Sequence, residues 1–119
     1  MTAPNLLALT ATYGKTTGTN IGTAVTVLVS NSLASAKSYK ITAMYVANID
    51  NALTGKISVD FYRSSTSIRL VDRMDIVPGD SLVVMSRDSA IYLEEGDSLR
   101  CYSDQNDLMH VTVSYETNT

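Results

Sequence analysis

Hydrophobic and polar residues alternate with a period of two in three stretches of the chain. The stretches run from Tyr39 to Tyr45, from Lys56 to Tyr62 and from Met109 to Tyr115. Successive side chains of a strand point to opposite faces, so this alternation predicts strands with one buried and one solvated face. Tyr39 and Tyr45 are expected on the inner face of the first strand. The residues expected in the core are Ile41, Ala43, Ile57, Val59, Phe61, Leu82, Val84, Leu99, Val111 and Val113.

Glycine, proline and acidic residues separate these stretches and predict turns. Val77–Asp80 places Pro78 and Gly79 at the centre of a type II turn, where glycine accepts a positive φ. A second turn is predicted at 94–97, a longer hairpin loop at 50–55, and a last hairpin closed by 104–107. Strands are expected near 8–13, 24–30, 38–48, 56–63, 67–76, 81–86, 90–93, 98–103 and 109–116. The expected fold class is all-β, a single antiparallel β-sandwich of jelly-roll or immunoglobulin-like type with seven to nine short strands.

The first 23 residues lack this alternation, which predicts a different organisation for them. We expect residues 1–23 to form an N-terminal arm and a polar loop, and residues 24–119 to form the β-sandwich domain. Residues 14–23 are polar and rich in glycine, which is typical of a mobile loop. Leu6 and Leu7 provide an apolar hook and are candidate partner-contact residues, the alternative being a frayed terminus.

Composition and charge narrow the class of protein. A chain of 119 residues with 45% hydrophobic residues can build one domain with its own core. The net charge of −3 disfavours nucleic acid as a partner, because phosphate binding requires a basic field. No apolar run is long enough to span a membrane, and no secretory signal is recognised. Cys101 is the single cysteine, which suits folding in a reducing compartment.

Two patterns in the sequence could indicate a catalytic or a metal-binding site. The sequence Gly-Asp-Ser-Leu occurs at 79–82 and 96–99 and matches a signature of serine esterases. Each serine leads into a strand, however, and His110 is the single histidine and cannot act as base for two sites. We therefore interpret both copies as turns. Asp104, Asp107 and Glu116 could bind calcium, but a solvated hairpin tip is the favoured interpretation. The sequence thus indicates no enzyme, no cofactor and no metal.

Exposed tyrosines give a further candidate surface. Tyr62 and Tyr102 could mark a protein-binding or a sugar-binding face. The arginines at 63, 69, 73, 87 and 100 are interspersed with acidic residues, which indicates surface charge or pairing between subunits. The chain has no tryptophan, which weakens the sugar-binding interpretation.

Four blocks of the chain occur in a fixed order between residues 39 and 116: Ile41–Asn48, Pro78–Val84, Leu93–Leu99 and Val111–Glu116. In this order they resemble a group of small virion structural proteins from tailed bacteriophages. In that group a strand ending in Ala-Asn, a hairpin similar to Pro-Ala-Gly, an acidic Glu-Gly-Asp turn and a terminal Ser-Tyr-Glu recur in this order. These motifs are mostly turn chemistry, and the N-terminal third of the chain lies outside the resemblance. No catalytic or ligand-binding residue can be transferred from the group.

The resemblance implies a β-sandwich subunit of a phage particle, assembled in the host bacterial cytoplasm and located in the virion. A capsid decoration (cement) protein is the first interpretation, and a neck or tail component is the alternative. The expected partners are copies of the chain itself, as a homo-oligomer such as a trimer, and the major capsid protein. A competing hypothesis from another class is a carbohydrate-binding module for host attachment, which requires an aromatic platform with convergent polar groups.

Overall fold

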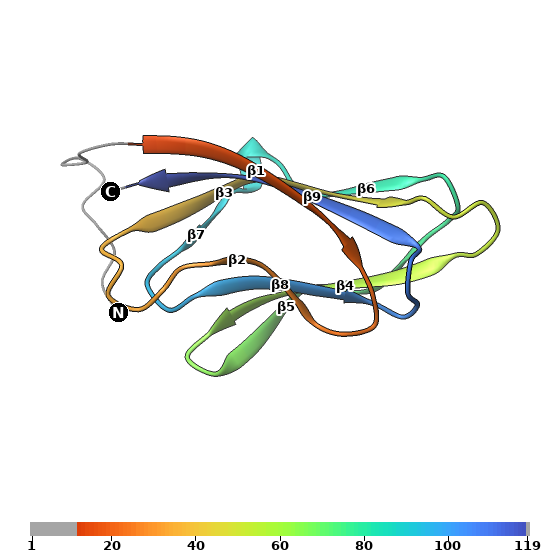
Figure 1. The fold of residues 1–119 in the computed structure, drawn as a ribbon, viewed down its shortest axis with the longest axis horizontal. Helices are drawn as coiled ribbons and strands as arrows, with labels where there is room; N and C mark the ends of the chain where they lie inside the picture. Colours follow the sequence, from red (N-terminus) through yellow and green to blue (C-terminus); the bar gives the residue numbers. More distant parts are fainter. Residues whose placement is uncertain (1–11, 119) are drawn as a thin grey trace.

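The chain folds into two antiparallel β-sheets packed face to face, as Figure 1 shows for the computed structural model. The structure describes residues 12–118. One sheet has the order β1 (Thr12–Ile21), β9 (Met109–Asn118), β3 (Ser38–Asn48) and β6 (Ser81–Met85), and β7 (Ile91–Leu93) also pairs with β3. The other sheet has the order β2 (Thr26–Ser30), β8 (Ser98–Ser103), β4 (Gly55–Arg63) and β5 (Thr66–Ile76). The predicted all-β sandwich is confirmed.

A short 3-10 helix, η2 (Arg87–Ser89), joins β6 to β7. No helix within residues 12–118 has the length and apolar character needed to cross a membrane.

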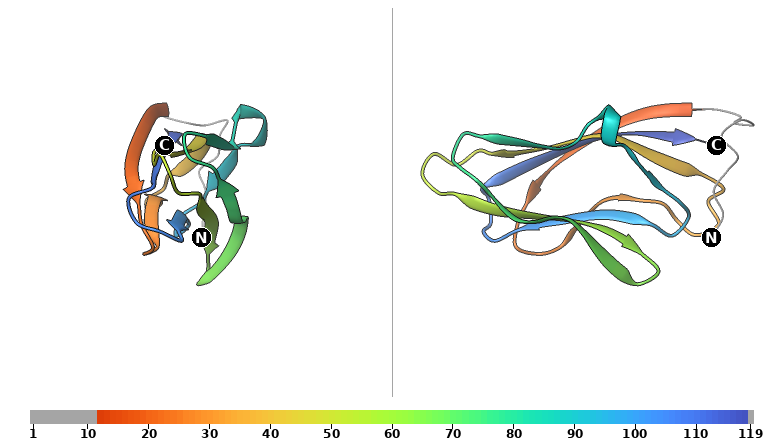
Figure 2. Two further views of the ribbon diagram at one scale, coloured as in Figure 1. Left: turned by 90° about the vertical axis from the view of Figure 1, so that its right-hand side faces the viewer. Right: turned by 180° about the vertical axis from the view of Figure 1, so that it is seen from behind.

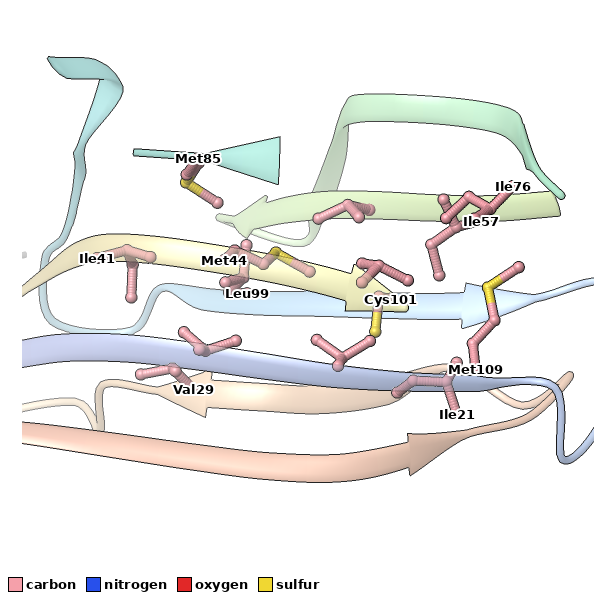
Figure 3. Close-up of a cluster of buried hydrophobic side chains, with 14 of the residues drawn as sticks. Ile21, Val29, Ile41, Met44, Ile57, Ile76, Met85, Leu99, Cys101 and Met109 are labelled. Carbon is pink, nitrogen blue, oxygen red and sulfur yellow. The ribbon is translucent and has the colours of Figure 1, made fainter. Parts of the chain in front are cut away.

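The core lies between the two sheets and is built from alternate residues of the central strands. Figure 3 shows Met44, Leu99 and Cys101 among the side chains that fill it. Six of the ten residues expected in the core are buried, and the other four, Ala43, Phe61, Leu82 and Val84, are only partly buried. The buried six are Ile41, Ile57, Val59, Leu99, Val111 and Val113.

A β-bulge in β3 explains where the inner-face prediction is wrong. The pairing of β3 with β9 shifts between Ile41 and Ala43, so Thr42 is left without a partner in the register. One extra residue reverses the side-chain alternation beyond it. Met44 and Val46 therefore face the core, whereas Tyr45 is 46% exposed. The expectation that Tyr45 lies on the inner face with Tyr39 is wrong.

All four predicted turns connect strands of different sheets. The loop 50–55 leads from β3 to β4, and 104–107 leads from β8 to β9, so both cross between the sheets and neither closes a hairpin. The tight hairpin of neighbouring strands is β4–β5, whose turn residues Ser64 and Ser65 have φ of 52° and 63°. Two positive φ values are typical of a type I′ turn, but Ser-Ser lacks the asparagine or glycine that usually signals one.

Strand β1 overturns the prediction of a polar loop. Residues 14–21 belong to β1, which pairs with β9 over ten residues from Thr12 to Ile21. Only Ile21 of this strand is buried, so no hydrophobic alternation marks it in the sequence. Backbone pairing at the edge of the sheet, together with the β propensity of its threonines, accounts for the strand. The β-sandwich therefore begins before residue 24. Leu6 and Leu7 lie outside the described residues.

Candidate interaction surfaces

The two Gly-Asp-Ser-Leu copies form two turns with the same hydrogen bonds. In the first, the Asn48 amide donates to Asp80 O at 3.0 Å, and the Gly79 amide donates to Asn48 O at 3.0 Å. In the second, the Asn31 amide donates to Asp97 O at 2.9 Å, and the Gly96 amide donates to Asn31 O at 2.7 Å. Gly79 and Gly96 have φ of 78° and 89°, as the predicted turns require.

The side chains of the two asparagines repeat this correspondence. Asn48 Nδ2 donates to Ile76 O at 2.8 Å, and Asn31 Nδ2 donates to Leu93 O at 3.0 Å; each acceptor precedes its turn by one residue. Both asparagines are buried, so these bonds satisfy polar groups that would otherwise be costly. The duplicated motif therefore has a structural role, which is to join a strand end to a turn that crosses between the sheets.

The serines of this motif have no arrangement typical of a catalytic site. Ser81 lies at the start of β6 and Ser98 at the start of β8, in different sheets. His110 is exposed on β9, paired with Asn20 and Ala47 in the register. Ser98 Oγ accepts a hydrogen bond from Arg100 Nε at 3.0 Å. The turn interpretation of the two copies is confirmed.

The carboxylates considered for calcium are used in loop structure. Asp104 Oδ1 accepts a hydrogen bond from the Lys56 amide at 2.8 Å, and Asp107 Oδ1 accepts one from Asn20 Nδ2 at 3.1 Å. Glu116 lies near the end of β9, opposite Gly14 and Lys40 in the register. Within residues 12–118, no three histidine, cysteine, aspartate or glutamate side chains are grouped to hold a metal ion.

The Cys101 thiol is enclosed in the core. Its side chain is fully buried on β8, and this burial raises the pKa of the thiol to about 12. A thiol with so high a pKa stays protonated near neutral pH and is a poor nucleophile.

Arginine and tyrosine residues cover the outer face of the four-stranded sheet. On β8, Arg100 and Tyr102 alternate with the buried Leu99 and Cys101, so the two polar residues face away from the core. The Arg100 guanidinium lies 3.7 Å from the centroid of the Tyr62 ring. A second guanidinium, that of Arg69, lies 5.4 Å from the centroid of the Tyr102 ring. We call Tyr62, Tyr102, Arg69 and Arg100 the arginine–tyrosine face.

A nearly buried carboxylate holds this face together. Asp60 is 6% exposed, and its Oδ1 atom lies 2.5 Å from Arg69 Nε. In the register of β4 and β8, Asp60 is directly opposite Arg100. One carboxylate thus lies beside two guanidinium groups, and it contacts that of Arg69. Each tyrosine ring has a guanidinium over it, and tyrosine and arginine are both enriched in protein interfaces.

An apolar groove lies between the tip of the β4–β5 hairpin and strand β7. It has a volume of about 390 Å³ and is lined by Phe61, Arg63, Ile68, Leu70, Ala90, Ile91 and Tyr92. Figures 1 and 2 show the hairpin tip diverging from the five-stranded sheet. Ile68 is 51% exposed and Leu70 is 41% exposed, so solvent reaches apolar side chains that would otherwise belong to the core. We call this the β5–β7 groove.

Arg63 fixes the rim of the β5–β7 groove. Its Nε and Nη2 atoms donate to Asp97 Oδ1 and Oδ2 at 2.9 and 2.6 Å, and its guanidinium lies 4.9 Å from the centroid of the Phe61 ring. The hydrogen bond to the buried Asp97 carboxylate raises the pKa of Arg63 above its ordinary value. The turn at 94–97 and the hairpin are therefore joined by a charged, bidentate pair.

Sequence reasoning identified Tyr62 and Tyr102 but missed the groove. Ile68 and Leu70 belong to a strand in which apolar and charged residues alternate, and such a strand is ordinarily expected to bury its apolar face. Their exposure depends on how far the hairpin diverges, for which the sequence has no signal. Comparison with protein-family models finds no family that matches the chain, and comparison with curated proteins finds no matching protein.

Proposed function

We propose that the chain is a structural subunit of a tailed-bacteriophage particle, a decoration protein that binds the outer face of the head and stabilises it. The observation on which the proposal mainly rests is the β5–β7 groove, an exposed apolar surface with aromatic residues and an arginine at its rim. Contiguous exposed apolar residues of this kind mark sites of protein association. The phage assignment comes from the resemblance over residues 39–116.

The structure gives the motifs of this resemblance a physical meaning. Asn48 of the Ala-Asn strand end binds the turn that contains Pro78 and Gly79, and Asn31 binds the Glu-Gly-Asp turn. These motifs therefore fix the two turns that connect one sheet of the sandwich to the other. The scaffold leaves its outer surfaces free to contact neighbours, and a decoration protein acts mechanically through such contacts.

The proposed partners are further copies of the chain and the major capsid protein, in a virion assembled in the bacterial cytoplasm. The β5–β7 groove is the surface we propose for the capsid protein. A position in the neck or tail is the alternative, and it differs from decoration in the number of copies per particle. A carbohydrate-binding module is the less favoured alternative, because Arg100 occupies one face of the Tyr62 ring and the chain has no tryptophan.

Substitution within the groove tests this proposal. Leu70→Asp is expected to weaken binding of the purified chain to heads assembled without it by at least about tenfold, because a charge replaces an interfacial apolar side chain. Leu70 is 41% exposed, so the fold is expected to persist. The measurement is the fraction of chain that sediments with the heads over a range of concentrations.

Thr66→Asp is the matched control, because Thr66 is exposed on the same hairpin and is not among the residues lining the groove. It is expected to bind as the wild type does. Equal binding by Leu70→Asp and the wild type would show that the groove is not the contact surface. Failure of the wild-type chain to bind any such heads would contradict decoration itself.

A further inference from the structure

The four lateral edges of the two sheets differ in how they are protected from pairing with another chain. An unprotected edge presents a row of unpaired amide and carbonyl groups, and natural proteins block such edges with short strands, bulges or charges. β2 has five residues and a register shift at Val27–Val29, while β6 and β7 have five and three residues. β5 is long, but it has two register shifts and charged residues at 69, 72, 73 and 75.

β1 has the weakest protection of the four edges. It pairs with β9 over ten residues without a register shift, and Lys15 is the one charged residue in it. Within residues 12–118 no strand pairs with its other edge. Figure 2 shows β1 at the outer margin of the sandwich, on the side away from β5. Every second residue of an edge strand directs its amide and carbonyl groups away from the neighbouring strand. Over the ten residues of β1, this edge therefore offers a row of such free backbone groups.

From this comparison we infer that the free edge of β1 binds the β1 strand of a second copy of the chain, antiparallel and about a two-fold axis. The second copy has an edge of matching length that is free in the same way. β1 contains no acidic residue although the chain has a net charge of −3, so two copies can approach along this edge without carboxylates on the pairing strands. A two-fold contact uses the same surface on both subunits and closes on itself.

The residues of β1 favour one register. With Thr17 on the two-fold axis, Lys15 faces Thr19 of the second copy and Tyr13 faces its Ile21. An axis at Lys15 would place two lysines directly opposite each other, which is destabilising. An axis at Thr16 would place Gly14 opposite Gly18, where no side chains can pack. The Thr17 register pairs residues 13–21 of both copies and forms about eight to ten backbone hydrogen bonds, the number found in a typical interface.

The two-fold contact predicts a dimer in place of the trimer expected from the sequence. Substitution of Thr19 tests both the contact and its register. Thr19 is exposed, and its hydroxyl donates only a long 3.4 Å bond to Asn20 O, so charged replacements are expected to leave the fold intact. Thr19→Lys places a lysine opposite Lys15 twice per dimer, whereas Thr19→Glu places a glutamate there twice.

We expect sedimentation equilibrium of the purified wild-type chain to show dimers at protein concentrations up to about 100 μM. Thr19→Lys should weaken dimerisation on the order of tenfold, and Thr19→Glu should strengthen it by a similar factor at low salt. Thr66→Lys, on the opposite sheet edge, is the control and should behave as the wild type. A wild-type monomer throughout this range, or an oligomer that neither Thr19 substitution affects, would overturn the inference.

A cross-link reports the register directly. Thr17→Cys places two thiols across the axis with Cβ atoms about 5 Å apart, within reach of a short bifunctional maleimide. Cys101 is buried with a raised pKa, so the introduced thiol should be the reactive one. Covalent dimers are expected from Thr17→Cys and not from Thr66→Cys; equal yields from the two variants would contradict the register. These measurements need no phage particle. The dimer inference can therefore fail while the proposed decoration function holds, and the decoration function can fail while the dimer is confirmed.

Discussion

Replacing Leu99 with alanine is expected to lower the free energy of unfolding by about 3–5 kcal/mol. Leu99 is fully buried in β8, opposite Phe61 of β4 on one side and Val29 of β2 on the other. Its removal leaves a cavity between the sheets that these neighbours can fill only in part, so the loss of transfer free energy is increased by a cavity cost. Urea denaturation followed by circular dichroism measures the change.

Leu53→Ala is the matched control, because Leu53 is 50% exposed in the loop from β3 to β4. It is expected to change the free energy of unfolding by less than about 1 kcal/mol. Phe61→Ala should lower the free energy of unfolding by less than the replacement of a fully buried phenylalanine would, since Phe61 is only partly buried beneath Arg63. A Leu99→Ala variant as stable as Leu53→Ala would contradict the position of Leu99 between the sheets.

Replacing Arg63 with alanine is expected to lower the free energy of unfolding by about 2–3 kcal/mol. The Asp97 carboxylate is fully buried and accepts two hydrogen bonds from Arg63 and one from the Glu94 amide at 2.8 Å. Without the guanidinium it keeps a single donor and an uncompensated charge. The side chain of Arg63 is 37% exposed, so water can replace it in part, which limits the cost.

Two further variants separate the buried pair from surface charge in general. Arg73→Ala removes an ion pair with Asp72 in which both side chains are more than half exposed, and it should change stability by less than about 0.5 kcal/mol. Adding Asp97→Asn to Arg63→Ala removes the uncompensated charge and should recover part of the loss. A loss for Arg63→Ala no larger than that for Arg73→Ala would show that the pair contributes little.

The central strands could be predicted from the sequence because burial of one face requires apolar residues at every second position. β4 and β9 alternate apolar and polar residues, and their inner residues Ile57, Val111 and Val113 lie in the core. β1 escaped prediction because it buries only Ile21 and is held by backbone pairing, which no side-chain pattern reports. The bulge at Thr42 escaped for a similar reason, since the alternation continues in the sequence although the backbone interrupts it.

The surfaces were less predictable than the strands. The glycine, proline and acidic residues at 77–80 and 94–97 correctly predicted turns. The same residue types occur in hairpins and in turns that cross between sheets, so the sequence could not tell which of the two these turns form. Tyr62 and Tyr102 were identified as surface residues from their alternation. Their pairing with Arg100 and Arg69, and the exposure of Leu70, depend on which strands become neighbours in space.

The proposal of a decoration protein is tested most directly by quantitative mass spectrometry of purified phage particles that contain the chain. Decoration predicts a copy number comparable to that of the major capsid protein, because each repeat of the head lattice offers the same binding surface. A number equivalent to a few rings would contradict decoration in favour of the neck or tail. Absence of the chain from the particle would contradict both assignments.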